Sequence, residues 1–202
     1  MSEYSRRDLL RHIGISMTMG AAGQYVLTAQ DVQHVHEAIA QQRGKYTPKS
    51  LTAHEYATLQ RLSDLIIPAD EHSPGALAAG AADYIDFLCS ASDEMKLIYT
   101  GGLAWLDEAT KHRYSGRDFV TAEAAQQTAM LDLIAYRENL RQDAALAPGI
   151  DFFTWARKMV ADGYYTSPIG IKDLGYVGNT AMTHFSVPQA AIDYAVKRSP
   201  FA

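Results

Sequence analysis

The histidines of this chain are the first candidates for metal binding, and they are widely scattered. His34 and His36 form an H-x-H pair, which on a β-strand would direct both rings to one face. The surrounding Val32, Val35 and Ile39 recur at helical spacing instead, and a helix points those two rings apart. The sequence therefore predicts no metal site at this pair.

Two pairs of adjacent carboxylates could serve acid–base chemistry. Asp93-Glu94 follows Ser92 and precedes an apolar periodic stretch, and acidic side chains in that place complement the dipole of a helix N-terminus. Asp70-Glu71 lies in a loop between Pro68 and Pro74, and nothing near it in the sequence completes a catalytic set. We therefore predict no catalytic residue at either pair.

Motifs for cofactors and nucleophilic catalysis are absent from the sequence. There is no G-x-G-x-x-G, no phosphate-binding P-loop, no C-x-x-C-H, no G-x-S-x-G and no H-E-x-x-H. The one cysteine, Cys89, cannot form a disulfide within the chain or supply a thiolate cluster. It ends an apolar run, 84–89, so we expect a buried thiol; the alternative is a disulfide to a partner.

The bulk composition suits one globular domain with an ordinary core. The chain has 202 residues, of which 48% are hydrophobic and 20% are charged. Its formal net charge of -5 gives no basic footprint, which argues against a nucleic-acid partner.

The first thirty residues have the features of an export address. Arg6 and Arg7 are followed by Leu9 and Leu10, and the run 13–29 contains no charged residue. This pattern is typical of a twin-arginine signal, and the run is too polar and rich in glycine for a convincing membrane span. We therefore expect residues 1–29 to send the protein to the periplasm; the alternative is an amphipathic helix with a chance arginine pair. Because that route carries folded proteins with cofactors inserted, and this chain has no cofactor motif, the cofactor is expected in another chain.

The remaining sequence predicts an all-α protein. Residues 30–50 are expected to form an extended N-terminal arm and linker, and residues 51–202 a helical accessory domain. Helical periodicity and capping signals predict an irregular bundle of about five to six helices. The expected helices cover 31–42, the stretch from Thr52 to Pro68, and stretches that begin at Ser73-Pro74, Ser92, Thr121, Asp151 and 186–188. Gly101-Gly102 must either break its helix or lie under a close neighbour.

Residues 163–180 fit neither helical nor strand periodicity, which predicts a long aperiodic loop. The loop is rich in tyrosine and poor in charge, a composition that suits either a protein interface or packing on the chain's own core. As partner-interface residues we select positions in this loop and in the N-terminal arm. They are Val35, Ile39, Tyr164, Tyr165, Pro168, Ile169 and Tyr176.

Three features together resemble the family of gluconate 2-dehydrogenase subunit 3, the small or gamma subunit. They are the twin-arginine start, the segment from Leu51 through Ile66-Ile67-Pro68-Ala69-Asp70 to Ser73-Pro74-Gly75-Ala76, and the late segment Gly175-Tyr176-Val177-Gly178-Asn179. The resemblance implies a small subunit that carries the export signal for a large flavoprotein of the glucose–methanol–choline type and helps it mature. FAD would be in that partner, a c-type cytochrome often accompanies it, and membrane association would be indirect. The family supplies no catalytic residues to transfer, and its partners oxidise gluconate, fructose, glucose or glucosides.

Two other interpretations remain open at this stage. One is an independent periplasmic enzyme or metal-binding protein that uses His54, His72 and Asp70-Glu71, if the loop folds back on the preceding helix. The other is a structural helical protein of the cell envelope.

Overall fold

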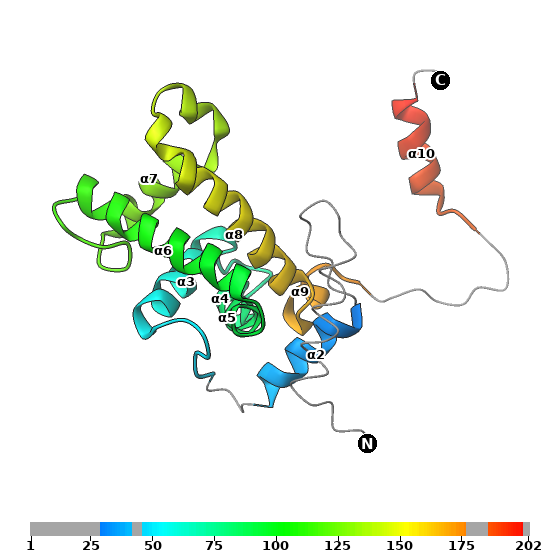
Figure 1. Cartoon of the computed structure of the whole chain (residues 1–202). Coiled ribbons are helices and arrows are strands. Elements are labelled where there is room, and N and C mark those ends of the chain that lie inside the picture. The colour runs from blue at the N-terminus through cyan, green and yellow to red at the C-terminus, as the bar shows by residue number, and fades with distance from the viewer. Residues whose placement is uncertain (1–28, 42–45, 177–185, 200–202) are drawn as a thin grey trace.

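The computed structural model describes residues 29–41, 46–176 and 186–199. Within those residues every regular element is helical, so the all-α prediction is confirmed. The arginine pair Arg6-Arg7, with Leu9 and Leu10, lies outside the described residues. The elements, shown in Figure 1, are α2 (Ala29–Ala40), α3 (Ala53–Ile66), α4 (Gly75–Ala78), α5 (Ala81–Ala91), α6 (Asp93–Arg113), α7 (Ala124–Ala135), η1 (Arg137–Arg141), η2 (Ala144–Leu146), α8 (Ala147–Tyr165), α9 (Pro168–Asp173) and α10 (Gln189–Arg198).

Local capping signals set the start of two long helices as predicted. The Glu55 N–H donates to Thr52 Oγ1, and the Thr52 N–H donates to Glu55 Oε2 at 2.8 Å, which completes a capping box for α3. Ser92 caps α6 by accepting the Met95 N–H. These caps use groups within one turn, which is why the sequence alone located them.

The core forms where α5, α6 and α8 pack against one another, with α3 and α7 beside them. Close approach of α6 and α8 depends on Gly102, because a Cβ there would lie 2.0 Å from the Phe152 ring. The helix α6 therefore continues through both glycines under a close neighbour. Cys89 is buried in α5, as expected, and burial raises the pKa of its thiol to about 12.

A buried carboxylate fixes the segment that precedes α3. Asp86, fully buried on α5, accepts hydrogen bonds from the Tyr46 hydroxyl at 2.7 Å and from the backbone N–H groups of Lys49, Ser50 and Leu51. Four donors compensate the cost of burying this charge. Residues 46–50, which the sequence predicted to be part of a linker, are thus fixed to the bundle.

The predicted extended arm is also wrong where the structure describes it. Helix α2 packs on α5, and its Val35 side chain is fully buried. The physical reason is long-range, since the ring of His36 stacks on Tyr84 of α5 with centroids 5.2 Å apart. The apolar face of α2 therefore contributes to this chain's own core.

Several predicted helix boundaries needed correction. The stretch from Ser73 divides into α4 and α5, because Gly80 adopts a left-handed backbone with φ of 74°. Helix α7 begins at Ala124 after a capping box from Glu123, and α8 begins at Ala147, with Pro148 in its first turn.

The prediction of an aperiodic loop over 163–180 is wrong for its first half. Helix α8 continues past Gly163 to Tyr165, and α9 follows almost at once. Residues 177–180 lie outside the described residues.

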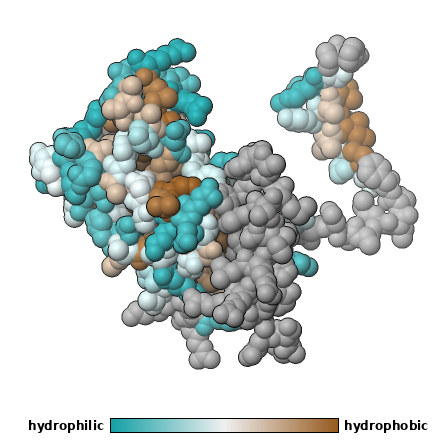
Figure 2. Space-filling model, in the orientation of Figure 1, coloured by the Kyte–Doolittle hydropathy of each residue, from teal (hydrophilic) through white to brown (hydrophobic). Residues whose placement is uncertain are grey.

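Helix α10, close to the predicted position of the last helix, stands apart from the bundle in Figure 1. Its side chains are exposed, and Figure 2 shows apolar residues along one side of it and polar residues along the other. Within the described part of the chain, no helix has the length and apolarity needed to cross a bilayer.

Candidate partner-binding groove

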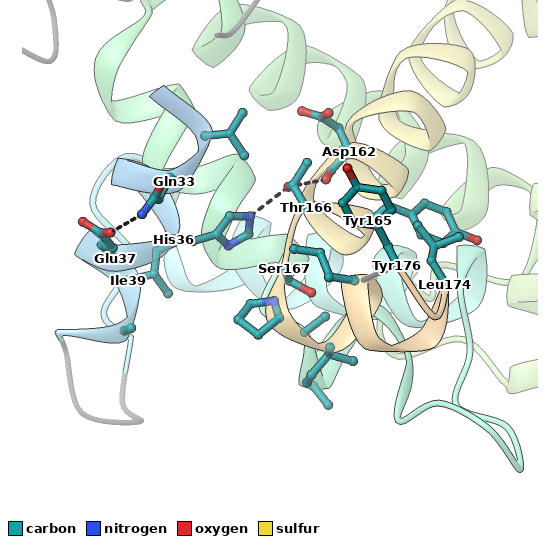
Figure 3. A pocket seen from close by; sticks show the side chains of 17 residues that line it. Gln33, His36, Glu37, Ile39, Asp162, Tyr165, Thr166, Ser167, Leu174 and Tyr176 are labelled. Atoms are coloured by element: carbon teal, nitrogen blue, oxygen red, sulfur yellow. Dashed lines mark hydrogen bonds between the residues drawn. The ribbon is translucent and has the colours of Figure 1, made fainter. Parts of the chain in front are cut away.

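An open, mainly apolar groove of about 950 Å³ lies between α2, the end of α8 and α9. Figure 3 shows Ile39 of α2 on one side and Leu174 and Tyr176, which follow α9, on the other. A recess of this size and character is suited to receiving apolar side chains of a binding partner.

The α9 wall is built by a tight reversal of the chain after α8. Ser167 caps α9 by accepting the Gly170 N–H at 3.1 Å, and Pro168 occupies the first turn. Gly170 lies against the backbone of α8, where a Cβ would be 2.0 Å from the Tyr164 carbonyl oxygen. A side chain larger than hydrogen at this position would push the α9 wall away from α8.

Tyr164 braces the same wall from inside the core. Its hydroxyl donates to Asp173 at 2.9 Å, near the end of α9, and also contacts Ser73 Oγ. Because the hydrogen of the tyrosine hydroxyl is used toward Asp173, Ser73 is the donor in the second contact. The network connects α9 to the loop before α4 through a side chain that is 1% exposed.

On the opposite wall, His36 connects α2 to the end of α8. Its Nε2 lies 2.8 Å from Thr166 Oγ1, and that hydroxyl donates to the Asp162 carbonyl at 2.6 Å (Figure 3). Since the Thr166 hydroxyl has one hydrogen and donates it to the Asp162 carbonyl, His36 Nε2 must be the donor in the bond between His36 and Thr166. Burial lowers the pKa of His36, against the raising effect of Asp162, which favours the neutral ring.

The charges of the groove are acidic. Among the described lining residues Glu37 and Asp162 are carboxylates, and none is a lysine or arginine. Glu37 is exposed and accepts a hydrogen bond from Gln33 at 2.9 Å, while Asp162 accepts one from the Tyr84 hydroxyl at 2.8 Å. The lining thus favours an apolar ligand with a neutral or basic edge.

The family model described as Gluconate 2-dehydrogenase subunit 3 matches residues 53–183. The chain belongs to the gluconate 2-dehydrogenase subunit 3 family. The match spans the bundle and the α9 wall, while α2 and α10 lie outside it. Comparisons with curated proteins and with solved structures give no match.

The structure of this subunit 3 family member brings together five of the seven residues predicted to contact a partner. Ile39, Tyr165, Pro168, Ile169 and Tyr176 all line the groove. Their contact with a partner stays a prediction, but their placement on one surface makes it testable with single substitutions.

The other two predicted contact residues lie inside the chain. Val35 of α2 is fully buried, and Tyr164, near the end of α8, is 1% exposed. This chain therefore covers both side chains, and their selection as surface contacts needs correction. The sequence favoured an interface for Tyr164 because the segment is rich in tyrosine and poor in charge, whereas the Tyr164 hydroxyl is bonded within the chain, to Asp173 and Ser73.

The predicted partner contacts leave out three of the larger apolar lining residues: Val32, Ile171 and Leu174. Val32 stands seven residues before Ile39, so helical spacing could have identified it. Ile171 and Leu174 are three residues apart, but this spacing places two side chains on one face only in a helix, and the sequence predicted a loop there.

The alternative histidine and carboxylate site does not assemble. His54 pairs with Asp107 of α6 at 2.7 Å, and Asp70 accepts the backbone N–H groups of His72 and Ser73 in its own loop. Among the described residues, no three His, Cys, Asp or Glu side chains gather as a metal site.

Proposed function

We propose that this chain is a non-catalytic small subunit that binds a large FAD-dependent dehydrogenase of the glucose–methanol–choline type and escorts it during maturation and export. The observation that carries the proposal is the match of residues 53–183 to a family described as a dehydrogenase subunit. The apolar groove supports it, since a subunit needs a surface for its partner.

The groove would form the centre of the interface and not its whole extent. A permanent interface buries more than about 2,000 Å² in total, which exceeds what one recess of this size supplies. Aromatic anchors near the middle of an interface contribute most of the binding energy. Tyr165 and Tyr176, which line the groove and are 43% and 62% exposed, are the candidates for such anchors.

FAD and the oxidation chemistry are assigned to the large subunit. The sequence of this chain has no dinucleotide-binding motif, and the partner would oxidise a sugar, a sugar acid or a glycoside. A c-type cytochrome is a further candidate partner for electron transfer, and it would supply the indirect association with the membrane.

The export role rests on the first residues of the chain. Arg6 and Arg7 precede Leu9 and Leu10 in the pattern of a twin-arginine signal, which would place the complex in the periplasm. A signal that moves folded cargo would let one small chain carry a large subunit with its flavin already bound.

A substitution of the arginine pair tests this role. Arg6→Lys with Arg7→Lys is expected to leave dye-linked sugar dehydrogenase activity in the cytoplasmic fraction, since lysine keeps the charge but not the guanidinium geometry. Arg11→Lys, outside the pair, is the matched control and should leave the activity in the periplasm. Unchanged export of the double variant would overturn the assignment of the signal.

A further inference from the structure

Helix α10 is amphipathic, yet it buries none of its side chains. Ala191, Ile192, Ala195 and Val196 fall at helical spacing along one side, and Figure 2 shows this apolar side. On the other side Gln189 donates to Asp193 at 2.8 Å. The helix thus has a narrow apolar stripe that faces solvent.

A helix of this length needs a surface to pack against. It has 10 residues, and isolated helices shorter than about 12–15 residues are marginal in water. The stability of such a helix comes from packing of its apolar face. Its own hydrogen bond and the stacking of Arg198 over Tyr194 at 3.9 Å do not bury the stripe.

The groove between α2 and α9 lies at the place where the chain leaves the bundle. Tyr176 lines the groove, and α10 begins at Gln189, so twelve residues separate the two. An extended chain of that length reaches roughly 40 Å, which is enough to return α10 to the groove in any orientation. A short tether also gives α10 a millimolar effective concentration there, on the order of that reached by linked modules.

The side-chain types and charges of the two surfaces are complementary. Small and branched side chains of α10 match a recess lined by Ile39, Pro168 and Ile169, in the manner of an amphipathic helix in an apolar groove. The groove carries Glu37 and Asp162, whereas the last turn of α10 carries Lys197 and Arg198. Lysine and arginine near acidic lining residues favour this occupant over an acidic helix.

We propose that the groove binds α10 of the same chain in the free subunit. The contact lies within the chain, so it stands or falls independently of the large dehydrogenase subunit. A partner that uses the groove would have to displace α10, so the helix would cover the apolar surface until that partner is present.

Paired cysteines test the contact in the full-length chain. Ile39→Cys with Ala195→Cys should form a disulfide within one chain under mild oxidation at low protein concentration. The native thiol does not interfere, because Cys89 is buried with a raised pKa. Two matched pairs serve as controls: Ile39→Cys with Asp193→Cys on the polar side of α10, and Leu97→Cys with Ala195→Cys, since Leu97 is 73% exposed on α6.

Peptide mapping under non-reducing conditions gives the outcome. The proposal predicts at least tenfold faster cross-linking within the chain for the groove pair than for either control. Equal rates for all three pairs would overturn it, and so would cross-linking mainly between chains, which would assign the groove to α10 of a second copy.

Amide hydrogen exchange gives an independent readout without cysteines. Residues 191–196 should exchange at least tenfold more slowly in the wild-type chain than in a Tyr165→Asp variant, whose charge enters the groove. Equally fast exchange in both proteins would overturn the proposal.

Discussion

The rings of Tyr164 and Tyr165, at the end of α8, contact each other edge to face, at 79° with centroids 4.9 Å apart. Tyr164 is 1% exposed and braces the core, whereas Tyr165 is 43% exposed and lines the groove. One of these neighbouring tyrosines therefore supports the core and the other lines the proposed partner surface, so we expect their substitutions to have different effects.

Replacement of Tyr165 by Asp should weaken the dehydrogenase complex by at least tenfold and leave the subunit folded. A charge in an apolar groove is costly to bury against a partner, while exposed substitutions change the free energy of unfolding by about 0.5 kcal/mol or less. Co-purification with the large subunit measures the effect. Leu97→Asp, on an exposed part of α6, is the matched control and should leave the complex intact. Equal retention of the partner by both variants would remove the groove from the interface.

Replacement of Tyr164 by Phe should lower the stability of the subunit and leave partner binding unchanged. It removes the hydroxyl that contacts Ser73 and donates to Asp173, so the free energy of unfolding should fall by about 1–2 kcal/mol. Urea unfolding of the isolated subunit measures the loss. The folded variant should still bind its partner, and a variant as stable as the wild type would show that the hydroxyl network contributes nothing.

The two adjacent glycines of α6 should respond differently to alanine. Gly101→Ala should raise the free energy of unfolding by up to about 1 kcal/mol, because a Cβ there meets nothing within 4 Å and alanine favours helix. Gly102→Ala should lower it by roughly 1–3 kcal/mol, because the new Cβ would collide with Phe152. Thermal or urea unfolding of both variants checks the contrast, and equal effects would contradict the close packing of α6 and α8.

These helix details also show how far the sequence could predict the fold. The capping box at Thr52 and the cap at Ser92 depend on groups within one turn, so local pattern was sufficient. The four bonds to Asp86 and the stacking of His36 on Tyr84 join residues more than thirty positions apart, which no local pattern encodes.

The residues of the groove also divide into those that local sequence patterns indicate and those that depend on long-range contacts. Tyrosine content and low charge indicated the segment 163–180, and several of its residues line the groove, as does Ile39 from the N-terminal arm. The wall itself was missed because α9 is a single short helix held by Gly170 against α8, and its apolar residues show no repeat long enough to recognise.

Acid should loosen α2 through His36. Burial lowers the pKa of this histidine in the folded chain, while an unfolded histidine titrates near about 6.5. Below that pH the unfolded state therefore binds more protons at this position, and folding stability falls until the pH passes the folded pKa. The measurement is the free energy of unfolding at pH 7.5 and pH 5.5 for the wild type and for His36→Gln. The wild type should lose more stability than the variant, and equal losses would contradict the role of His36.

We propose that this family member works as one subunit of a flavin dehydrogenase. The most direct measurement is to tag the chain at its C-terminus, purify it gently from its native host, and record the visible spectrum and the co-purifying chains. We expect a flavin spectrum, a large second chain and sugar-oxidising activity that belongs to that second chain. A colourless, stable, single chain with no partner would contradict it.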